Sequence, residues 1–591
     1  MNKFANLKKL FFKRSTLIIL ILILATLPRL FLLGEVPFYL NRDEASIGYN
    51  AYALMRTGRD EHGVAWPINV ESFGDWKLPI YIYVTIPFIA IFGLTTWSIK
   101  LPAVIAGLTV VGMTYLLLTQ LLKNYGSEKD QKNYFWLPVL ASLVVALSPW
   151  AIHLSRLTYE ANLAMALFLT GWWLIERSKK TTLASKFSAT KLQFFGGLIL
   201  LMMTVFTYHS YQVFLPIFAL VWAGFNFTYI KQIIAKQKLF VCIVATILLV
   251  AIGLFWIGQQ TDQASEVKFT GLSIFEDAHY LEDLHRNRQY LAQAGVPSWM
   301  QSLIINTYTL RINAFFTNIV QTFSPLFLFV DGGAHRTHNF SIIANFHLLE
   351  LFVVIGGMII FLRRHLGRLP AWWWIIVSWL LVAALPAAIT VEPAHSVRFA
   401  AALPAIASLI ALGLLSIGKI WSRFTIPILV ALYLFSVWQW SFNYFIVAPN
   451  RDYHHSEWLM PRLADALYPL LDEYEEIYVP LLRRSPYIFF LFHWQYDPNL
   501  LHYNLSHSPP DEEGFTYAYR LGNINFEDLP ATFENEQRRV LILFPYSAWS
   551  DWHRADERFT IIETFADERD PSHYYLVDFR PSLTSSNAIQ P

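Results

Sequence analysis

Ionisable residues gather just after the first apolar segment of the chain. The run 17–33 is followed closely by Asn41-Arg42-Asp43-Glu44. Ionisable side chains are costly near hydrocarbon, so a cluster at this place is a candidate functional site. A carboxylate there can act as a general base that takes a proton from an acceptor hydroxyl or amine. We expect Asp43 and Glu44 to be catalytic and Arg42 to bind substrate.

A structural explanation of the same residues stays open. Asn41 or Asp43 could cap a helix that begins near Glu44, because residues 45–56 have helical spacing. The two interpretations are compatible, since a helix start would hold a catalytic carboxylate rigidly.

A second polar group, Asp75-Trp76-Lys77, lies some thirty residues further along, before an apolar stretch at 80–94. The ammonium of Lys77 is a compact charge suited to a leaving phosphate. It could equally be an interfacial anchor whose aliphatic stem lies in the membrane. We take Asp75, Lys77 and Tyr81 as candidate substrate-binding residues, although Tyr81 also fits an interfacial aromatic belt.

The turn 153–160 carries Arg156 and Glu160. In the topology below it lies on the same face of the membrane as Asp43. The sequence predicts that Glu160 is a further catalytic carboxylate and that Arg156 binds substrate. Alternatively the two side chains, four residues apart, form only a helical ion pair.

A third turn on this face, 392–398, contains His395 and Arg398. Arg398 at a membrane boundary suits a lipid-linked phosphate, but equally an ordinary lipid headgroup. We count both residues among the candidates for substrate binding.

The long loop 259–340 offers two weaker signals. Residues 276–285 have the residue types of a metal site, but their spacing is more typical of a solvated amphipathic helix. The Gly-rich stretch 331–338 is either a plain turn or a loop that binds the acceptor through His338. A metal ligand set therefore stays unknown, and carboxylates near a phosphate suit either a bound divalent cation or none.

The composition predicts an integral membrane protein. The chain has 591 residues, of which 55% are hydrophobic and 15% charged, and this balance is unlike that of a soluble protein. Apolar runs of 17–25 residues are long enough to cross the hydrocarbon core. A net charge of +2 predicts no nucleic-acid partner, and the single cysteine, Cys242, excludes an internal disulfide framework.

Charge sets the predicted topology. The loops assigned to the cytoplasm, with the N-terminus, hold 21 of the 45 Lys and Arg residues but only 3 of the 43 Asp and Glu residues, as the positive-inside rule requires. Segment 80–94 then lies at the interface; if it crosses, a second extra crossing gives 13 helices. The eleven expected spans are 15–33, 97–122, 135–152, 161–175, 192–207, 211–228, 239–258, 341–362, 371–390, 397–417 and 424–446.

Beyond the last span the composition changes. Residues 476–480, 539–544 and 574–579 are predicted strands, and 457–474 has a helical period. We therefore expect a membrane domain at 1–446, with its catalytic loop at 34–96, and a soluble α/β domain at 447–591. The odd number of spans places this second domain outside the cytoplasm.

These residues together resemble the GT-C fold glycosyltransferases, in particular the protein O-mannosyltransferase and lipid A aminoarabinose transferase families. The resemblance covers about 15–446. It lies in Asp43-Glu44 after the first helix, Trp76-Lys77-Leu78-Pro79, the turn from Leu154 to Glu160 and the loop from Asp331 to His338.

The resemblance implies a polytopic helical enzyme of the plasma (inner) membrane. Such an enzyme uses a polyprenyl-phosphate sugar as donor and a lipid, protein or glycan as acceptor, on the outer face. It further implies that Asp43 is the base, that Lys77 and Arg398 hold the donor phosphate, and that Glu160 is a second acidic site residue. The main alternative is a transporter or flippase for a lipid-linked or anionic substrate. A receptor acting through its soluble domain would leave the outer carboxylates unexplained.

Overall fold

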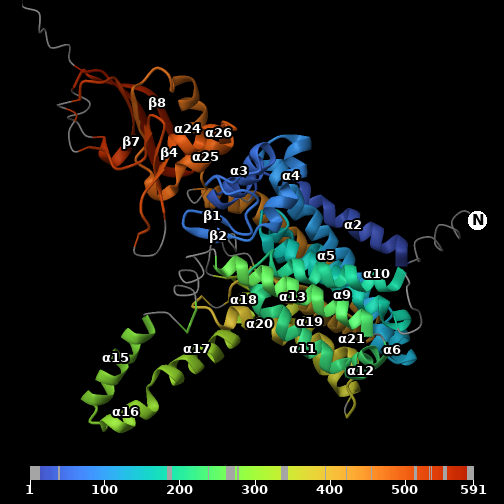
Figure 1. Ribbon diagram of the computed structural model, residues 1–591. Helices are drawn as coiled ribbons and strands as arrows, with labels where there is room; N and C mark the ends of the chain where they lie inside the picture. The colour runs from blue at the N-terminus through green and yellow to red at the C-terminus, as the bar shows by residue number, and fades with distance from the viewer. Residues whose placement is uncertain are drawn as a thin grey trace, which may run out of the picture. The chain divides into compact units, whose positions relative to one another are not determined.

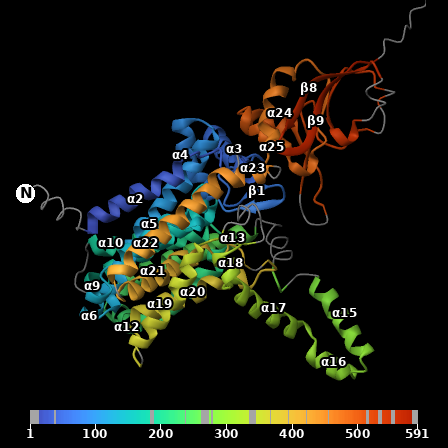
Figure 2. The same cartoon turned by 180° about the vertical axis from the view of Figure 1, so that it is seen from behind.

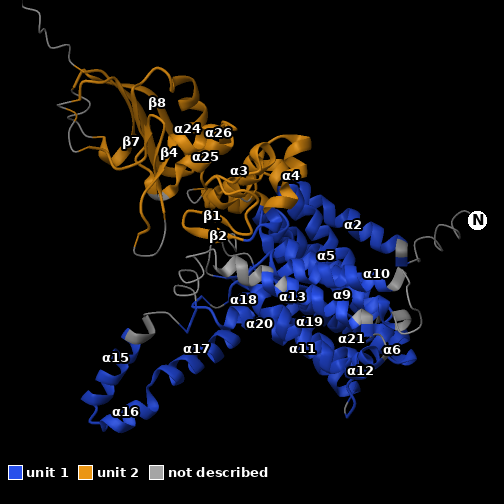
Figure 3. Cartoon of the chain, in the orientation of Figure 1, with its two compact units in different colours: residues 1–33, 78–81, 100–444 blue, residues 34–77, 82–99, 445–591 orange. Residues whose placement is uncertain are grey.

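The chain is mostly helical, with a seven-stranded sheet near its C-terminal end (Figure 1). The computed structural model divides into two compact units (Figure 3). The first comprises 1–33, 78–81 and 100–444, and the second 34–77, 82–99 and 445–591. The residues that the structure describes are 14–36, 40–182, 189–236, 238–260, 273–275, 279–333, 344–365, 367–392, 394–420, 422–453, 456–511, 516–530, 533, 536–549 and 556–581.

The first unit contains a bundle of long apolar helices, and a helix lies at each of the eleven predicted positions. Their bounds are α2 (Arg14–Leu30), α5 (Thr96–Tyr125), α7 (Leu137–Leu147), α9 (Glu160–Thr182), α10 (Ala189–Val205), α11 (Ser210–Phe225), α13 (Lys238–Gln260), α19 (Leu348–Arg364), α20 (Ala371–Ala388), α21 (Leu403–Gly418) and α22 (Ser422–Phe442).

Among the described residues, five helical stretches are long and apolar enough to cross a membrane, and a bent pair would make a sixth. Four of the five coincide with predicted spans. The fifth, Ser298–Phe329, falls in the predicted outer loop 259–340, where no span is expected. The number of crossings stays a prediction.

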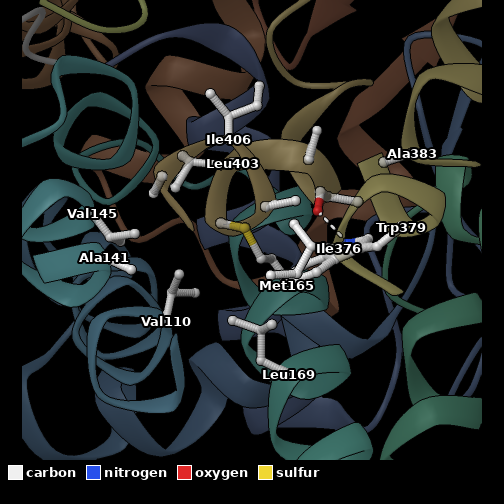
Figure 4. Packing of buried hydrophobic residues seen from close by; sticks show 14 of the residues in the cluster. Val110, Ala141, Val145, Met165, Leu169, Ile376, Trp379, Ala383, Leu403 and Ile406 are labelled. Carbon is white, nitrogen blue, oxygen red and sulfur yellow. Dashed lines mark hydrogen bonds between the residues drawn. The ribbon is translucent and has the colours of Figure 1, made fainter. Parts of the chain in front are cut away.

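Side chains from distant segments fill the centre of the bundle. Figure 4 shows Met165 and Leu169 of α9 beside Trp379 of α20 and Leu403 of α21. The indole of Trp379 donates a hydrogen bond to the Ala401 carbonyl at 2.9 Å, which satisfies a polar group that is otherwise buried.

Helices α19 and α21 approach each other at two glycines. A Cβ added to Gly357 would lie 2.1 Å from Cα of Gly413, so neither position accepts a larger residue at this spacing. Small residues at such crossings allow membrane helices to pack backbone to backbone.

Two predicted helices are interrupted or shortened. The span 135–152 breaks at Ser148, and α8 (Pro149–Leu154) follows with Pro149 at its first position. Proline lacks the N–H that a continuous helix would use there. Helix α19 begins at Leu348 rather than at 341, which places Glu350 in its first turn.

The second unit joins the first loop to the C-terminal region. Helix α3 (Arg42–Thr57) packs against α25 (Pro486–His493), since a Cβ at Gly48 would lie 2.6 Å from the Phe492 ring. The hairpin β1 (Val70–Ser72) and β2 (Asp75–Lys77) and the apolar helix α4 (Ile80–Phe92) complete the loop. Most of this loop belongs to the same compact unit as 445–591, and the domain boundary at 446 stays a prediction.

The C-terminal sheet has the strand order β4-β5-β6-β3-β7-β9-β8. Strand β3 pairs parallel to β6 and β7, and the remaining pairs are antiparallel. Three predicted strands are confirmed as β3 (Glu476–Tyr478), β7 (Val540–Pro545) and β9 (Asp570–Phe579). The remaining elements are α24 (Leu459–Leu467), α26 (Pro498–Asn504), β4 (Leu505–His507), β5 (Ala518–Leu521), β6 (Ile524–Asn525) and β8 (Phe559–Asp567).

Candidate functional site

The predicted site residues divide between the two units. The second unit holds Arg42, Asp43, Glu44, Asp75 and Lys77, and the first holds Tyr81, Arg156, Glu160, His395 and Arg398. His338 lies outside the described residues.

The start of α3 is fixed by a capping box. The Asn41 side chain accepts a hydrogen bond from the Glu44 N–H at 2.9 Å, and the Glu44 carboxylate accepts one from the Asn41 N–H at 3.3 Å. This arrangement satisfies two N–H groups that a helix start leaves without partners. Glu44 is buried, with 1% of its surface exposed. The capping interpretation is thus correct for Asn41 and Glu44, and it leaves Asp43 between them as the exposed carboxylate.

Asp43 and Lys77 form an ion pair, with 3.0 Å between the Lys77 Nζ and an Asp43 carboxylate oxygen. The Lys77 side chain is 7% exposed and that of Asp43 54%. The lysine is therefore buried in the unit, while about half of the Asp43 side chain is exposed.

Phe73 lies at the turn that brings Lys77 into place. Strands β1 and β2 pair Ser72 with Asp75, which leaves Phe73 and Gly74 as a two-residue turn with φ of 61° and 76°. Such turns need positive φ at both positions and favour Asn, Asp or Gly. A buried phenylalanine there is strained and must be held by its surroundings.

The Phe73 ring connects two cations with the C-terminal region. The Arg42 guanidinium and the Lys77 ammonium lie 5.5 and 5.4 Å from its centroid, within the range of a cation–π interaction. The Phe73 and Tyr487 rings are packed edge to face, with 6.0 Å between their centroids. The Phe73 carbonyl accepts a hydrogen bond from the Thr516 N–H at 3.3 Å. Residues 445–591 therefore help to set the position of both cations.

A buried carboxylate lies in the same unit. Glu61 accepts hydrogen bonds from the Asn50 amide at 2.9 Å, and from the hydroxyls of Ser72 and Tyr487 at 3.4 Å each. Burial raises the pKa of Glu61, while the nearby charge of His62 opposes the shift. This network joins α3, β1 and α25, so its first role is to hold the loop together.

Among the residues that the structure describes, no three His, Cys, Asp or Glu side chains are grouped closely enough to hold a metal ion.

In the first unit, Arg156 has a structural role. Its guanidinium is buried and donates hydrogen bonds to the carbonyls of Pro28 and Leu32 at 2.6 and 2.9 Å. These carbonyls lie at the C-terminal end of α2, where a cation is stabilised by the helix dipole. Arg156 and Glu160 do not share a helix, because α8 ends at Leu154 and α9 begins at Glu160.

The other first-unit candidates lie at the ends of helices. Arg398 pairs with Glu392, with 3.6 Å between the guanidinium and the carboxylate. The backbone N–H of Arg398 donates a hydrogen bond to the His395 ring at 3.4 Å. Glu160 is half-buried at the start of α9, and Tyr81 is fully buried in α4.

Sequence reasoning missed Phe73, Glu61 and Tyr487. A signal existed for the first, since Phe73-Gly74 between two short polar and apolar alternations is a hairpin pattern. The contacts of Glu61 and Tyr487 depend on packing between segments more than 400 residues apart, as their separation of 426 shows.

Neither a protein-family model nor a curated protein matches the sequence. Among solved structures, the chain is similar to ArnT from Cupriavidus metallidurans bound to undecaprenyl phosphate, with a TM-score of 0.52, 9% identity, and coverage of 96% of this chain and 98% of that one. The chain has the GT-C fold. The GT-C fold predicted from the four segments above is thereby confirmed, with its helical membrane architecture.

A weaker similarity links the GT-C chain to the archaeal oligosaccharyltransferase AglB from Archaeoglobus fulgidus, in complex with an inhibitory peptide and a dolichol-phosphate. The TM-score is 0.45 at 12% identity, and the match covers 81% of this chain but only 63% of the oligosaccharyltransferase.

Proposed function

We propose that this protein is a membrane glycosyltransferase that moves a sugar from a polyprenyl-phosphate donor to an acceptor on the outer face of the membrane. The GT-C fold supports the class of enzyme, and the similar ArnT structure contains undecaprenyl phosphate. The observation that carries the proposal is the ion pair of an exposed Asp43 carboxylate and a buried Lys77 ammonium, 3.0 Å apart.

The reaction follows from the chemistry of these two groups. Asp43 takes the proton of an acceptor hydroxyl or amine, and the acceptor atom attacks the anomeric carbon of the donor. The bond between that carbon and the phosphate oxygen breaks, and polyprenyl phosphate leaves with inversion at the anomeric centre. Lys77 offsets the negative charge that grows on the phosphate.

The ion pair also gives an order to these events. When the donor phosphate binds Lys77, it competes with Asp43 for the ammonium protons, so the carboxylate becomes more available as a proton acceptor. Arg42, on the same ring of Phe73, is a second cation for the phosphate. Glu44 is committed to the capping box, so we assign the base to Asp43 alone. Arg398 and Glu160 stay predicted site residues of the membrane bundle.

The test is sugar transfer by purified full-length protein from labelled polyprenyl-phosphate sugars. Asp43→Asn keeps the side-chain shape but removes the base, so we expect normal folding and a loss of turnover of at least a hundredfold, the lower range for general-base catalysis. Glu44→Gln is the matched control: it retains a capping side chain and should keep most activity.

Two results would count against the proposal. If Asp43→Asn turns over like the wild type, Asp43 is not the base. If the wild type transfers none of several donors to any of several acceptors, the transporter alternative gains support.

A further inference from the structure

A helical arm extends sideways from the bundle of the first unit (Figures 1 and 2). It consists of α15 (His279–Gln293), α16 (Ser298–Ile304) and α17 (Thr307–Thr322). The Arg288 guanidinium donates a hydrogen bond to the Ile305 carbonyl at 2.9 Å, which ties α15 to the turn between α16 and α17. The arm is therefore a folded hairpin of helices.

The base of the arm is fixed at the end of a spanning helix. The Asn318 amide donates to the carbonyls of Ala388 and Thr390 at 3.1 and 2.8 Å, and the Ile274 N–H donates to the Ile389 carbonyl at 3.1 Å. Helix α20 is an apolar candidate span that ends at Ala388. At 1.5 Å per residue such a helix is close to the thickness of the hydrocarbon core. The arm thus leaves the bundle at a membrane boundary.

The outward face of α17 has two parallel rows of side chains, each with a spacing of four residues. The first row is apolar and 57% to 77% exposed, and it consists of Tyr308, Ile312, Phe316 and Val320. The second row is also exposed, and it consists of Thr309, Asn313, Thr317 and Gln321. Residues four apart on a helix lie one above the other, so an apolar and an uncharged polar row run side by side along α17.

We propose that this arm lies along the membrane surface and binds a lipid bilayer through α17. The apolar row enters the region of the acyl chains, and the polar row faces the headgroups. A lipid surface fits better than a protein partner because the arm begins at a membrane boundary, next to the end of the apolar helix α20. The exposed Trp299 of α16 and Tyr308 of α17 are of the aromatic types enriched at that depth.

The charge of the two rows predicts the kind of lipid contact. Interfacial helices that depend on anionic lipids carry Lys or Arg on their polar face. Both rows of α17 are uncharged, so apolar burial alone drives the contact. Neutral phosphatidylcholine should serve as well as an anionic membrane, and salt should not release the arm.

The experiment uses full-length protein with Cys242→Ser, in which a single new cysteine carries an environment-sensitive fluorophore. Ile312→Cys and Phe316→Cys probe the apolar row, Asn313→Cys the adjacent polar row, and Glu282→Cys the exposed face of α15. In phosphatidylcholine vesicles, we expect a shift of emission to shorter wavelength at 312 and 316, with quenching by spin labels on the acyl chains. Position 313 should respond more to headgroup spin labels, and 282 should behave as in water.

Emission at 312 and 316 equal to that at 282 would overturn the proposal. A shift without quenching by any spin-labelled lipid would show that protein covers the row. The measurement would then be repeated in nanodiscs that hold one copy of the chain. Loss of the shift there would identify a second copy as the partner. A shift that needs anionic lipid or low salt would refute apolar burial as the driving force.

Discussion

Replacing Phe73 with asparagine separates two contributions of one side chain. Asparagine accepts the positive φ of 61° more readily than phenylalanine does, and relief of that strain is worth about 1 kcal/mol. The same change removes a ring that is 4% exposed, and loss of a buried phenylalanine ring costs about 3–5 kcal/mol. We expect a net loss of about 2–4 kcal/mol in the stability of the hairpin and its contacts.

The effect on donor binding has a different source. Without the ring, Arg42 and Lys77 lose the group that lies 5.5 and 5.4 Å from them. One cation–π interaction at a partly exposed site is worth about 0.5–1 kcal/mol, so two give about 1–2 kcal/mol. If all of this energy holds the cations in place for the phosphate, the Kd for undecaprenyl phosphate rises roughly five- to thirtyfold, which is the upper limit.

Hydrogen exchange over residues 70–77 measures the first effect, and titration with undecaprenyl phosphate measures the second. Phe73→Tyr keeps the ring and should differ little from the wild type in both. If Phe73→Asn exchanges and binds like the wild type, the ring neither holds the hairpin nor positions the cations, and the reasoning is refuted.

Three further predictions follow from other parts of the chain. Asn41→Ala should cost about 1 kcal/mol of stability, seen as a lower Tm, whereas Asn41→Asp should retain the cap; equal Tm values for both variants would contradict the capping box. Gly413→Ala would place a Cβ 2.4 Å from the Val353 carbonyl and should cost about 1–3 kcal/mol, while Gly253→Ala, which meets nothing within 4 Å, should be tolerated. Burial lowers the pKa of His507 to about 4 from about 6.5 in the unfolded chain, so its contribution to stability, about 3 kcal/mol at most, is present above pH 6.5 and lost as the pH falls towards 4. His507→Gln should reduce the acid sensitivity of unfolding, and an unchanged pH profile would exclude His507 as its source.

The sequence predicted what local pattern and membrane physics determine. Apolar runs predicted the positions of the helices, and alternating apolar and polar residues predicted β3, β7 and β9. The cost of charge near hydrocarbon indicated Asp43 and Lys77 as site residues. These two residues are only 34 positions apart and belong to one loop, so their pairing was within reach of sequence reasoning.

The remaining features depend on tertiary contacts. A carboxylate at the start of a helix caps that helix or meets a substrate according to its rotamer and burial, and Glu44 caps. An arginine near a membrane boundary binds either a phosphate or the end of a helix, and Arg156 binds the end of α2. The helix expected within 276–285 agrees with α15, but α16 and α17 were missed, because 259–340 was expected to be a loop.

The grouping of the first loop with the C-terminal region has a consequence for biosynthesis. The Tyr49 hydroxyl donates to the Tyr496 carbonyl, across a separation of 447 residues. At roughly 5–20 residues per second of synthesis, α3 leaves the ribosome roughly 20–90 seconds before its partner α25 exists. During that interval its apolar face has no native surface to pack against. The nascent chain therefore has a window in which the loop is exposed to proteases and open to capture by chaperones. The second unit begins with residues 34–77 and is completed only when residues 445–591 have been synthesised.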